Sequence, residues 1–351
     1  MKKQDITTNF APMHASLAFI VLFLFVYFLN VAKDLLLPLV IAIGFWYLIN
    51  ALAKRFGRLQ FGDFKMPRFL SFVLAITAMG CGIWGVSELI TRNLAEVVQA
   101  APGYQKNLEA TMAALTKDLP IQGFLMDKSF TEFLDVGGIV GSLAKTFTGL
   151  AGKTLIIFVY VAFLLYEQRT FDGKISAMIS DPKKESSVRS VLKTIDEKIQ
   201  LYIWVKTVMS ALTGGLSFVV LKWVGVDFAE FWALIIFFLN FIPTIGSMLG
   251  IVFPALLTLI QFNGYSEFIV VSLGLSAVQM SIGNFLDPRM MGESLNLSPL
   301  VIILSLATWG TIWGIPGMFL SIPIMVIVAI MLGQFQMTRG IAVLLSKNGK
   351  I

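Results

Sequence analysis

The polar side chains that interrupt long apolar stretches are the candidates for chemistry in this 351-residue sequence. Its single histidine, His14, lies at the edge of the first apolar stretch, and its single cysteine is Cys81. These two residues cannot supply a histidine metal pair, a Ser-His triad inside the apolar core, a disulfide framework or a cysteine zinc cluster. No phosphate-binding P-loop motif occurs either. The sequence therefore predicts no enzyme, no cofactor and no metal site.

Two amides lie at points where a helix is expected to break or end. Asn240 lies beside a predicted break and Asn284 beside a predicted helix end, where freed backbone groups and a side-chain amide converge on a polar solute. The alternative for any polar residue taken singly is a hydrogen bond between helices worth about 0.6 kcal/mol, which is the preferred explanation for the serines and threonines. The predicted solute-binding residues are Asn240, Pro243, Thr244, Gly246, Gln279, Asn284, Gly314, Pro316 and Gly317.

Three charged residues near the end of one apolar stretch suggest ion coupling. They are Asp287, Arg289 and Glu293, and the acidic residues among them can carry a coupling proton or sodium ion if they lie at the core of a transporter. The alternative is a cytoplasmic loop in which Asp287 ends the span before Pro288 and Arg289 pairs with an acid. No charge lies between Glu267 and Asp287, which favours a neutral polar solute over sodium/proton exchange.

The elements that must position these residues are two apolar runs too long for one crossing. Ser294–Thr338 has 45 residues without Lys, Arg, Asp or Glu, and Phe231–Ser266 has 36. A helix of 45 residues would be about 65 Å long, roughly twice a bilayer's hydrocarbon thickness. Gly/Pro-containing segments at Asn240–Gly250 and Thr308–Gly317 predict a fold-back in each run. Paired broken helices of this kind mark the binding site of many transporters.

Composition defines the class of protein. Hydrophobic residues make up 57% and charged residues 14% of the chain, against about 45–50% and about 25% in soluble domains. The sequence therefore predicts an all-α polytopic integral membrane protein. The net charge of +6 lies in short loops between apolar spans rather than on one face, so it indicates membrane orientation and no nucleic-acid partner.

Span counting gives the expected organisation. The loop Lys54–Arg68 carries five basic residues and one acidic residue, so it and both termini are predicted to be cytoplasmic. The first two spans, Ala15–Ala32 and Leu35–Ala53, are expected to form a tight hairpin. The predicted units are a three-span unit at 1–90, an extracytoplasmic helical insertion at 91–150, a span with a cytoplasmic helical segment at 151–206, a transport core at 207–338 and a cytoplasmic tail at 339–351.

Within these units, the charges of Glu167–Lys206 are expected to form a solvated helical face, with Asp181 and Pro182 at a helix start. In the core, a span, a polar link and a broken segment occur twice in opposite directions. This order predicts two inverted repeats whose hairpins enter from opposite faces.

Three motifs carry a resemblance to a known family. "LNFIPTIGSMLG" at Leu239–Gly250, "GNFLDPRMMGESLNLSPLVIILSL" at Gly283–Leu306 and "WGTIWGIPGMFLSIP" at Trp309–Pro323 resemble the autoinducer-2 exporter family of bacterial inner-membrane proteins. The order of spans and the helical insertion agree over nearly the whole chain. The resemblance implies export of autoinducer-2 or another small solute from a homo-oligomer in the inner membrane. Family members have also been proposed as sodium(lithium)/proton antiporters.

Two positions differ from the forms associated with the family. Thr244 stands where an aromatic residue or Asn often lies, and Asp287 where Glu commonly precedes Pro.

The preferred function is export of a small polar solute by alternating access around the two broken hairpins. The alternatives are a sodium(lithium)/proton antiporter, a channel or a scaffold. A channel would need a regular polar stripe along a pore-lining helix, and we expect no helix of this chain to carry one. A scaffold would not need two broken hairpins with polar groups near their tips.

Overall fold

The computed structural model describes residues 11–58, 60–61, 64–118, 138, 149, 152–262, 265–292 and 295–349. In these ranges six helices are long and apolar enough to cross a membrane, and a seventh span results if the bent pair α7 (Thr154–Glu167) and α8 (Phe171–Met178) counts as one. The six are Lys33–Phe56, Arg68–Asn93, Pro182–Val224, Ile245–Phe262, Tyr265–Met291 and Ile315–Gly333. The predicted all-α polytopic membrane fold is confirmed.

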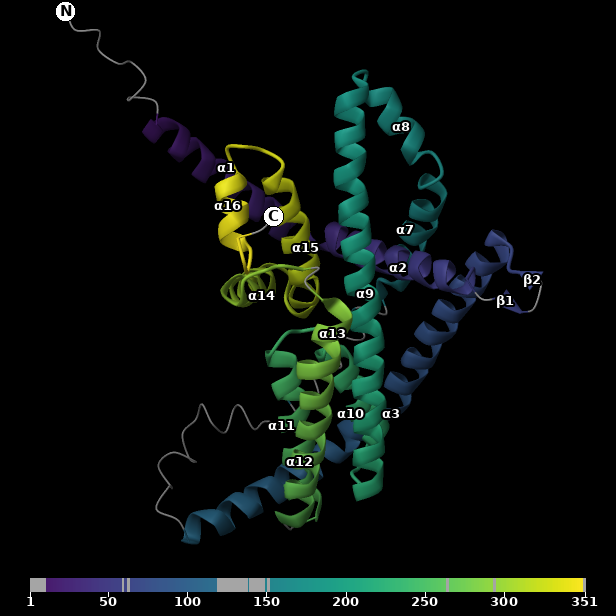
Figure 1. Ribbon diagram of the computed structural model, residues 1–351. Helices are drawn as coiled ribbons and strands as arrows, with labels where there is room; N and C mark the ends of the chain where they lie inside the picture. Colours follow the sequence, from purple (N-terminus) through teal and green to yellow (C-terminus); the bar gives the residue numbers. More distant parts are fainter. Residues whose placement is uncertain are drawn as a thin grey trace, which may run out of the picture.

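Helix α9 (Pro182–Val224) is the axis on which the rest of the fold packs (Figure 1). The Asp181 side chain accepts a hydrogen bond from the backbone of Lys183 at 2.9 Å, and Pro182 occupies the first turn, so the predicted helix start is confirmed. Gly225 ends the helix with a φ of 83°. The 43 residues extend about 65 Å without interruption across the expected boundary at 206/207.

Both long apolar runs are broken, as the sequence predicts. The first consists of α10 (Ala229–Leu239) and α11 (Ile245–Phe262), and the second of α14 (Pro299–Trp313) and α15 (Ile315–Gly333). Residues 240–244 form the first turn, in which Thr244 has a φ of 61°. Gly314 alone forms the second turn, with a φ of 67° and a ψ of −147° that favour glycine.

The two hairpins approach each other from opposite ends of α9. In Figure 1 the α10–α11 hairpin lies beside the lower half of α9 and the α14–α15 hairpin beside its upper half. Gly214 of α9 packs against Ala233 and Phe237 of α10, whereas Ile199 and Tyr202 cluster with Ile322 and Val326 of α15. Near their tips, Phe241 of the first turn stacks on Phe319 of α15 with 5.6 Å between ring centroids. This opposed arrangement is the one expected of inverted repeats.

A glycine in each hairpin allows the two limbs to meet closely. A Cβ atom on Gly246 would lie 1.7 Å from the carbonyl oxygen of Leu239, and one on Gly317 would lie 2.0 Å from that of Trp309. Both positions are in contact with rigid backbone rather than flexible side chains. The tight turns therefore depend on the missing side chain.

We expect Gly246→Ala and Gly317→Ala each to reduce stability by about 3 kcal/mol, the upper end of the usual range for overpacked cores. Folded protein is measured by fluorescence size-exclusion chromatography after heating detergent-solubilised samples. Gly215→Ala in α9 is the matched control, because no atom lies within 4 Å of its added Cβ. Equal heat resistance of all three variants would contradict the prediction.

The segment after the first hairpin continues as a helix further than expected. α12 (Tyr265–Met280) passes through a π-helical stretch, Ser281–Leu286, into α13 (Asp287–Met291). The alternative in which Asp287 ends the span before a loop is therefore wrong, since the helix continues to Met291. A π-helical turn widens the helix locally and often accompanies functional sites. α16 (Arg339–Leu345) follows the second hairpin, and a β-bridge joins Leu297 to Ser346.

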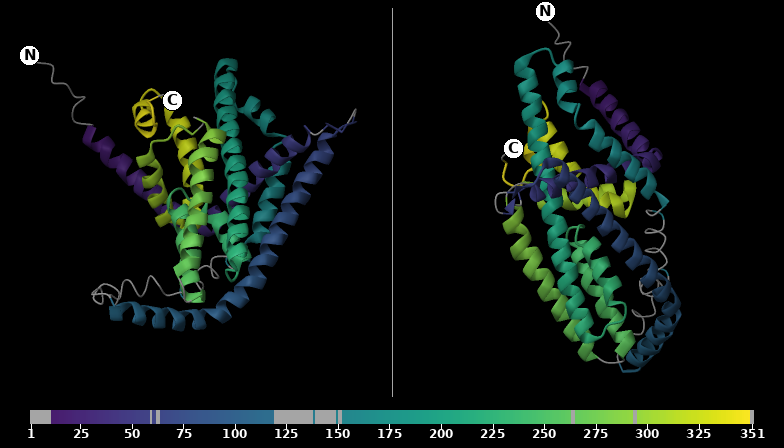
Figure 2. Two further views of the ribbon diagram at one scale, coloured as in Figure 1. Left: turned by 60° about the horizontal axis from the view of Figure 1, so that its bottom comes forward. Right: turned by 90° about the vertical axis from the view of Figure 1, so that its right-hand side faces the viewer.

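The N-terminal helices are more open than predicted. α1 (Ala11–Val31) and α2 (Lys33–Phe56) meet at Ala32 as the arms of a V in the left view of Figure 2. The prediction that the first two spans form a tight hairpin is wrong, because the single linking residue does not let the two helices lie antiparallel in contact. Phe19 and Phe23 of α1 are 71% and 63% exposed. The indole Nε1 of Trp313 donates to the Leu29 carbonyl at 3.0 Å and links α1 to the second hairpin.

Helix α3 (Arg68–Asp118) joins the third span to the insertion without interruption. It follows the two-residue strands β1 (Gln60–Phe61) and β2 (Phe64–Lys65). The helix contains Pro102 and curves beneath the first hairpin in the left view of Figure 2. The expected boundary at 90/91 therefore falls inside one helix. Most of 119–150 lies outside the described residues.

The continuation of α3 packs on the ends of the transport core. The Tyr104 hydroxyl donates to Asp227 at 2.7 Å, and the Asn107 amide donates to the Ile260 carbonyl at 3.4 Å. The pKa of Tyr104 is raised well above its ordinary value, first because the group is removed from water and second because of the hydrogen bond to Asp227. These contacts support the prediction that the insertion packs on the membrane core.

Candidate functional site

A buried ion pair marks the candidate site. Lys206 of α9 places its Nζ 2.7 Å from Oδ2 of Asp287, at the start of α13, and the two side chains are only 11% and 16% exposed. Every other ion pair among the described residues has a partner more than 30% exposed. Buried charges are costly and in membrane segments usually serve function.

The tip of the first hairpin contacts the same lysine. Asn240 caps the C-terminal end of α10 and is 6% exposed. Its carbonyl oxygen accepts a hydrogen bond from Lys206 Nζ at 3.4 Å, and its Nδ2 donates to Ser210 Oγ at 3.1 Å. Lys206 and Ser210 are one turn apart and so lie on the same face of α9. The hairpin tip is therefore held to α9 at two points.

Two polar atoms at this site have no hydrogen-bond partner within the described parts of the chain. They are Asp287 Oδ1 and the hydroxyl oxygen of Tyr202, whose residue is 2% exposed and lies one turn before Lys206. Each unpaired buried polar group costs about 1–3 kcal/mol. A ligand that donates to the carboxylate and bonds to the phenol would remove this cost.

Lys206 is part of a buried polar stripe along α9. Tyr202, Lys206, Ser210, Thr213 and Ser217 are each at most 8% exposed and recur every three or four residues. This spacing places all five on one helical face. The expectation that no helix carries a regular polar stripe is therefore wrong. In this conformation the first hairpin covers the central part of the stripe, because Gly214 packs against α10 and Ser210 bonds to Asn240, whereas Tyr202 packs against α15 of the second hairpin.

The sequence missed Lys206, which we assigned to a solvated face of a cytoplasmic segment. That assignment is wrong, since the side chain is 11% exposed. The i, i+4 spacing of Tyr202, Lys206 and Ser210 was the signal that could have found it. Charged neighbours at Glu197 and Lys198 hid this signal by making Lys206 look like the end of a charged segment.

The structure brings Asn240 and Asp287 together and places the other predicted residues of the first half around them. Pro243 and Thr244 lie in the hairpin turn, where Thr244 is exposed, and Gly246 lies in the first turn of α11. Gln279 is 8% exposed, and its Nε2 packs beside Gly250 of α11. Gln279 therefore lies against the hairpin.

The remaining predicted residues do not join the Lys206 cluster. Asn284 is exposed on the π-helical stretch, and Arg289 is exposed in α13. Glu293 lies outside the described residues. Gly314 forms the turn of the second hairpin, and Pro316 and Gly317 lie in the first turn of α15. The described residues contain no group of three His, Cys, Asp or Glu side chains that could hold a metal ion.

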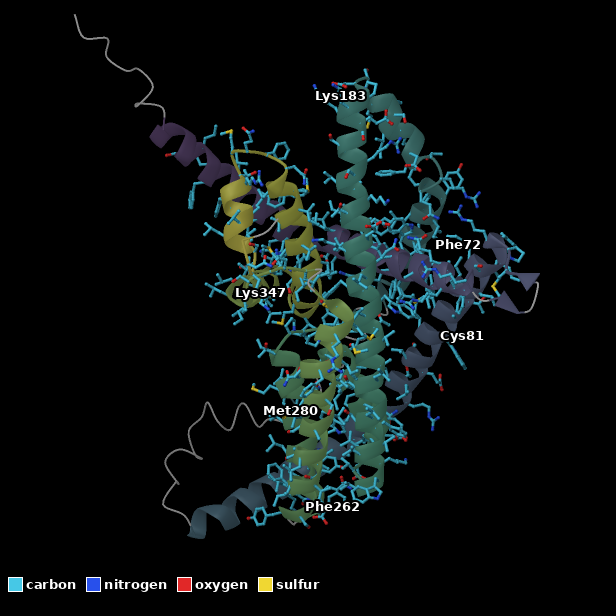
Figure 3. All side chains as sticks on the ribbon, in the orientation of Figure 1. Phe72, Cys81, Lys183, Phe262, Met280 and Lys347 are labelled. Atoms are coloured by element: carbon cyan, nitrogen blue, oxygen red, sulfur yellow. The ribbon has the colours of Figure 1, made fainter. Side chains whose placement is uncertain are left out.

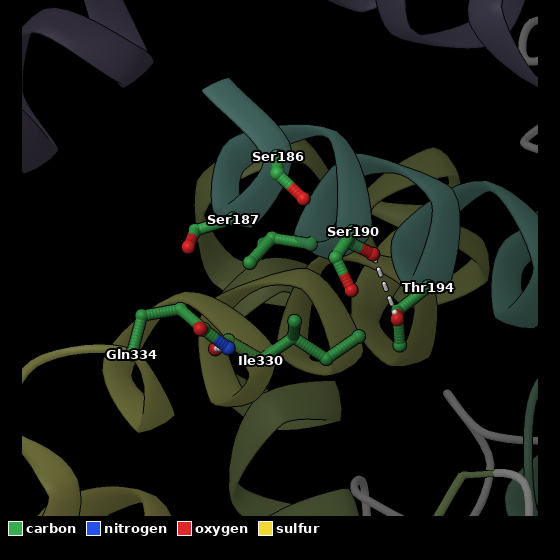
Figure 4. A pocket seen from close by; sticks show the side chains of 7 residues that line it. Ser186, Ser187, Ser190, Thr194, Ile330 and Gln334 are labelled. Carbon is green, nitrogen blue, oxygen red and sulfur yellow. Dashed lines mark hydrogen bonds between the residues drawn. The ribbon is translucent and has the colours of Figure 1, made fainter. Parts of the chain in front are cut away.

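A groove of about 420 Å³ lies elsewhere, between the first part of α9 and the end of α15 (Figure 4). Its lining is Ser186, Ser187, Ser190, Val191, Thr194, Ile330 and Gln334. Ser187 and Thr194 donate to backbone carbonyls of their own helix at 3.0 Å, so these hydroxyls are already bonded. Ser190 is 16 residues before Lys206, about 24 Å along the helix. The groove is therefore separate from the buried cluster.

Comparison with known proteins gives a consistent result. A profile described as "AI-2E family transporter" matches residues 17–337. The chain is 30% identical over 323 residues to "AI-2 transport protein TqsA" of Escherichia coli K12, an alignment that covers 91% of each chain. It is 29% identical over 301 residues to "Putative transport protein YhhT" of the same organism, with 84% and 83% of the two chains aligned.

Proposed function

Because this chain belongs to the AI-2E family, which consists of transport proteins and not of enzymes, we propose that it exports autoinducer-2 or a similar small polar solute. We place it in a bacterial inner membrane with both termini in the cytoplasm. TqsA, the relative named for autoinducer-2 transport, is similar over nearly the whole chain. The two opposed hairpins support an alternating-access mechanism.

The buried polar stripe of α9 is the observation that carries the proposal. Two of its five side chains, Tyr202 and Ser217, have no hydrogen-bond partner in the described chain, and a buried hydroxyl without a partner is costly in a dry interior. The first hairpin covers the central part of the stripe and is held to it through Asn240. Movement of the hairpin tip away from α9 would expose the stripe to a solute from one side.

The chemistry of the cluster suits a neutral solute with several hydroxyls. As a carboxylate oxygen, Asp287 Oδ1 accepts a hydrogen bond, whereas the Tyr202 hydroxyl can donate and accept. Once the hairpin tip moves, the Asn240 amide and the Ser210 hydroxyl also become available. These groups together replace the water that a polyhydroxylated molecule loses on entering the protein.

Transport of radiolabelled autoinducer-2 into inverted membrane vesicles tests the function. We expect uptake by the wild type and at least about a tenfold loss for Asn240→Leu, because the side-chain amide that bonds to Ser210 and would face the solute is removed, and a factor of ten corresponds to about 1.4 kcal/mol. Asn284→Leu is the matched control, since Asn284 is exposed and should retain uptake. Absence of wild-type uptake would refute this substrate, and normal uptake by Asn240→Leu would refute the site.

The orientation is tested by labelling the two ends of α9. Single cysteines replacing Lys184 and Asp227 should react with a membrane-impermeant maleimide from opposite sides, Lys184 from the cytoplasm. Cys81 must first be replaced, because it is exposed on α3 (Figure 3). Labelling of both positions from the same side would contradict the proposed topology.

A further inference from the structure

The ammonium of Lys206 contacts two oxygen atoms in a buried position. It contacts Asp287 Oδ2 at 2.7 Å and the Asn240 carbonyl oxygen at 3.4 Å, and the whole residue is 8% exposed. No other ion pair reaches either partner among the described residues. A carboxylate and a backbone carbonyl are the ligand types that small hard cations prefer.

The end of α10 adds a second attraction for positive charge. The helix ends at Leu239, and the Asn240 carbonyl next to it accepts a bond from Lys206 and from no other group in the described chain. The C-terminal end of a helix carries a partial negative charge that stabilises cations. In transporters with broken helices, such ends and unwound carbonyls coordinate sodium.

Two further oxygens complete the surroundings. Asp287 Oδ1 and the Tyr202 hydroxyl are buried and have no hydrogen-bond partner in the described chain. Lys206 and Tyr202 are one turn apart, so the phenol lies on the face of α9 that carries the ammonium. The site therefore offers more oxygen atoms than the ammonium uses.

We propose that Lys206 acts as a tethered cation that fills a sodium-type site. Its ammonium takes the place of an inorganic ion between Asp287 and the tip of the first hairpin. The hairpin then closes on α9 without binding sodium, because the ammonium supplies the positive charge that the ion would bring. Removal of the ammonium should leave a site in which sodium binds to the carboxylate and the freed carbonyl.

Because the Lys206 ammonium already occupies this site, solute export is preferred there over sodium/proton exchange. The meaning of this proposal for the transport cycle rests on the proposed function. Its test measures ion binding alone. Failure of autoinducer-2 transport would leave the ion result unaffected, and the reverse also holds.

The experiment compares thermal unfolding of the purified protein in sodium chloride and in choline chloride at equal ionic strength. The variants are Lys206→Ala, which creates space, and Lys206→Gln, which keeps a hydrogen-bond donor without the charge. We expect the wild-type Tm to be the same in both salts. Both variants should unfold at lower temperature in choline and gain several degrees in sodium, with saturation as sodium rises.

Two controls define the site. Lys222→Ala removes a lysine from the same helix whose partner, Glu230, lies at 3.1 Å on the surface, and it should show no sodium response. The double variant Lys206→Ala/Asp287→Asn should lose the response because the charged ligand is gone. The proposal is overturned if neither Lys206 variant responds, if the wild type responds equally, or if the double variant keeps the response. Failure of both Lys206 variants to fold even in sodium would also overturn it.

Discussion

Asp287→Leu should abolish transport and lower the free energy of unfolding by about 3–5 kcal/mol, the usual cost of leaving one member of a buried ion pair without its partner. The ammonium of Lys206 would remain enclosed with only the Asn240 carbonyl, 3.4 Å away. Vesicle uptake and thermal unfolding of the purified protein measure the two effects separately.

The double variant Lys206→Met/Asp287→Leu separates stability from function. Replacing both members of a buried pair by apolar residues is often neutral for stability, so we expect near wild-type unfolding without transport. Glu230→Gln is the matched control, since it breaks the exposed pair with Lys222 and should change neither measurement. Normal transport by the double variant would show that the ion pair serves packing alone.

Linking the tips of the two hairpins should reduce transport at least about tenfold, because alternating access requires one hairpin to move relative to the other. Phe241 and Phe319 stack at 5.6 Å, so cysteines at these positions are close enough for a short cross-linker. The variant is Phe241→Cys/Phe319→Cys with Cys81 replaced. Uptake is measured after treatment with a reducible bis-methanethiosulfonate reagent.

The cross-link is reversible, which supplies the control. Dithiothreitol should restore uptake, and each single-cysteine variant should be unaffected by the reagent. Full uptake by protein whose tips are linked, as judged by a mobility shift on gels, would exclude movement between the tips during transport.

Run length and turn chemistry explain why the two hairpins could be predicted from the sequence. An uncharged run of 36 or 45 residues exceeds one crossing, and Gly or Pro marks the point where the helix must stop. The breaks accordingly fall at residues 240–244 and at Gly314, inside the predicted segments. The opposed directions of the two hairpins could also be predicted, by counting the spans between them.

Partners across helices could not be predicted in the same way. Lys206 looked like the end of a charged segment, because charge counting along the chain does not tell which face of a helix is covered. Its burial depends on α10 and α13, which pack on α9 from 34 and 81 residues away. The position of Asn284 depends on local helix geometry instead. The π-helical stretch changes the residue spacing per turn, so the amide faces away from the cluster while Asp287 faces into it.

Because α9 is long and uninterrupted, a small tilt at one point would displace its ends by a larger distance. Lys206 is the 25th of its 43 residues, so the N-terminal end of α9 lies about 36 Å from the ion pair. A tilt of about 10° about Lys206 would displace that end by about 6 Å, at the same 1.5 Å rise per residue. α8 is fastened to this end through Arg189, which binds Asp172 at 2.8 Å. A tilt of α9 at the ion pair would therefore move α8 together with this end of α9.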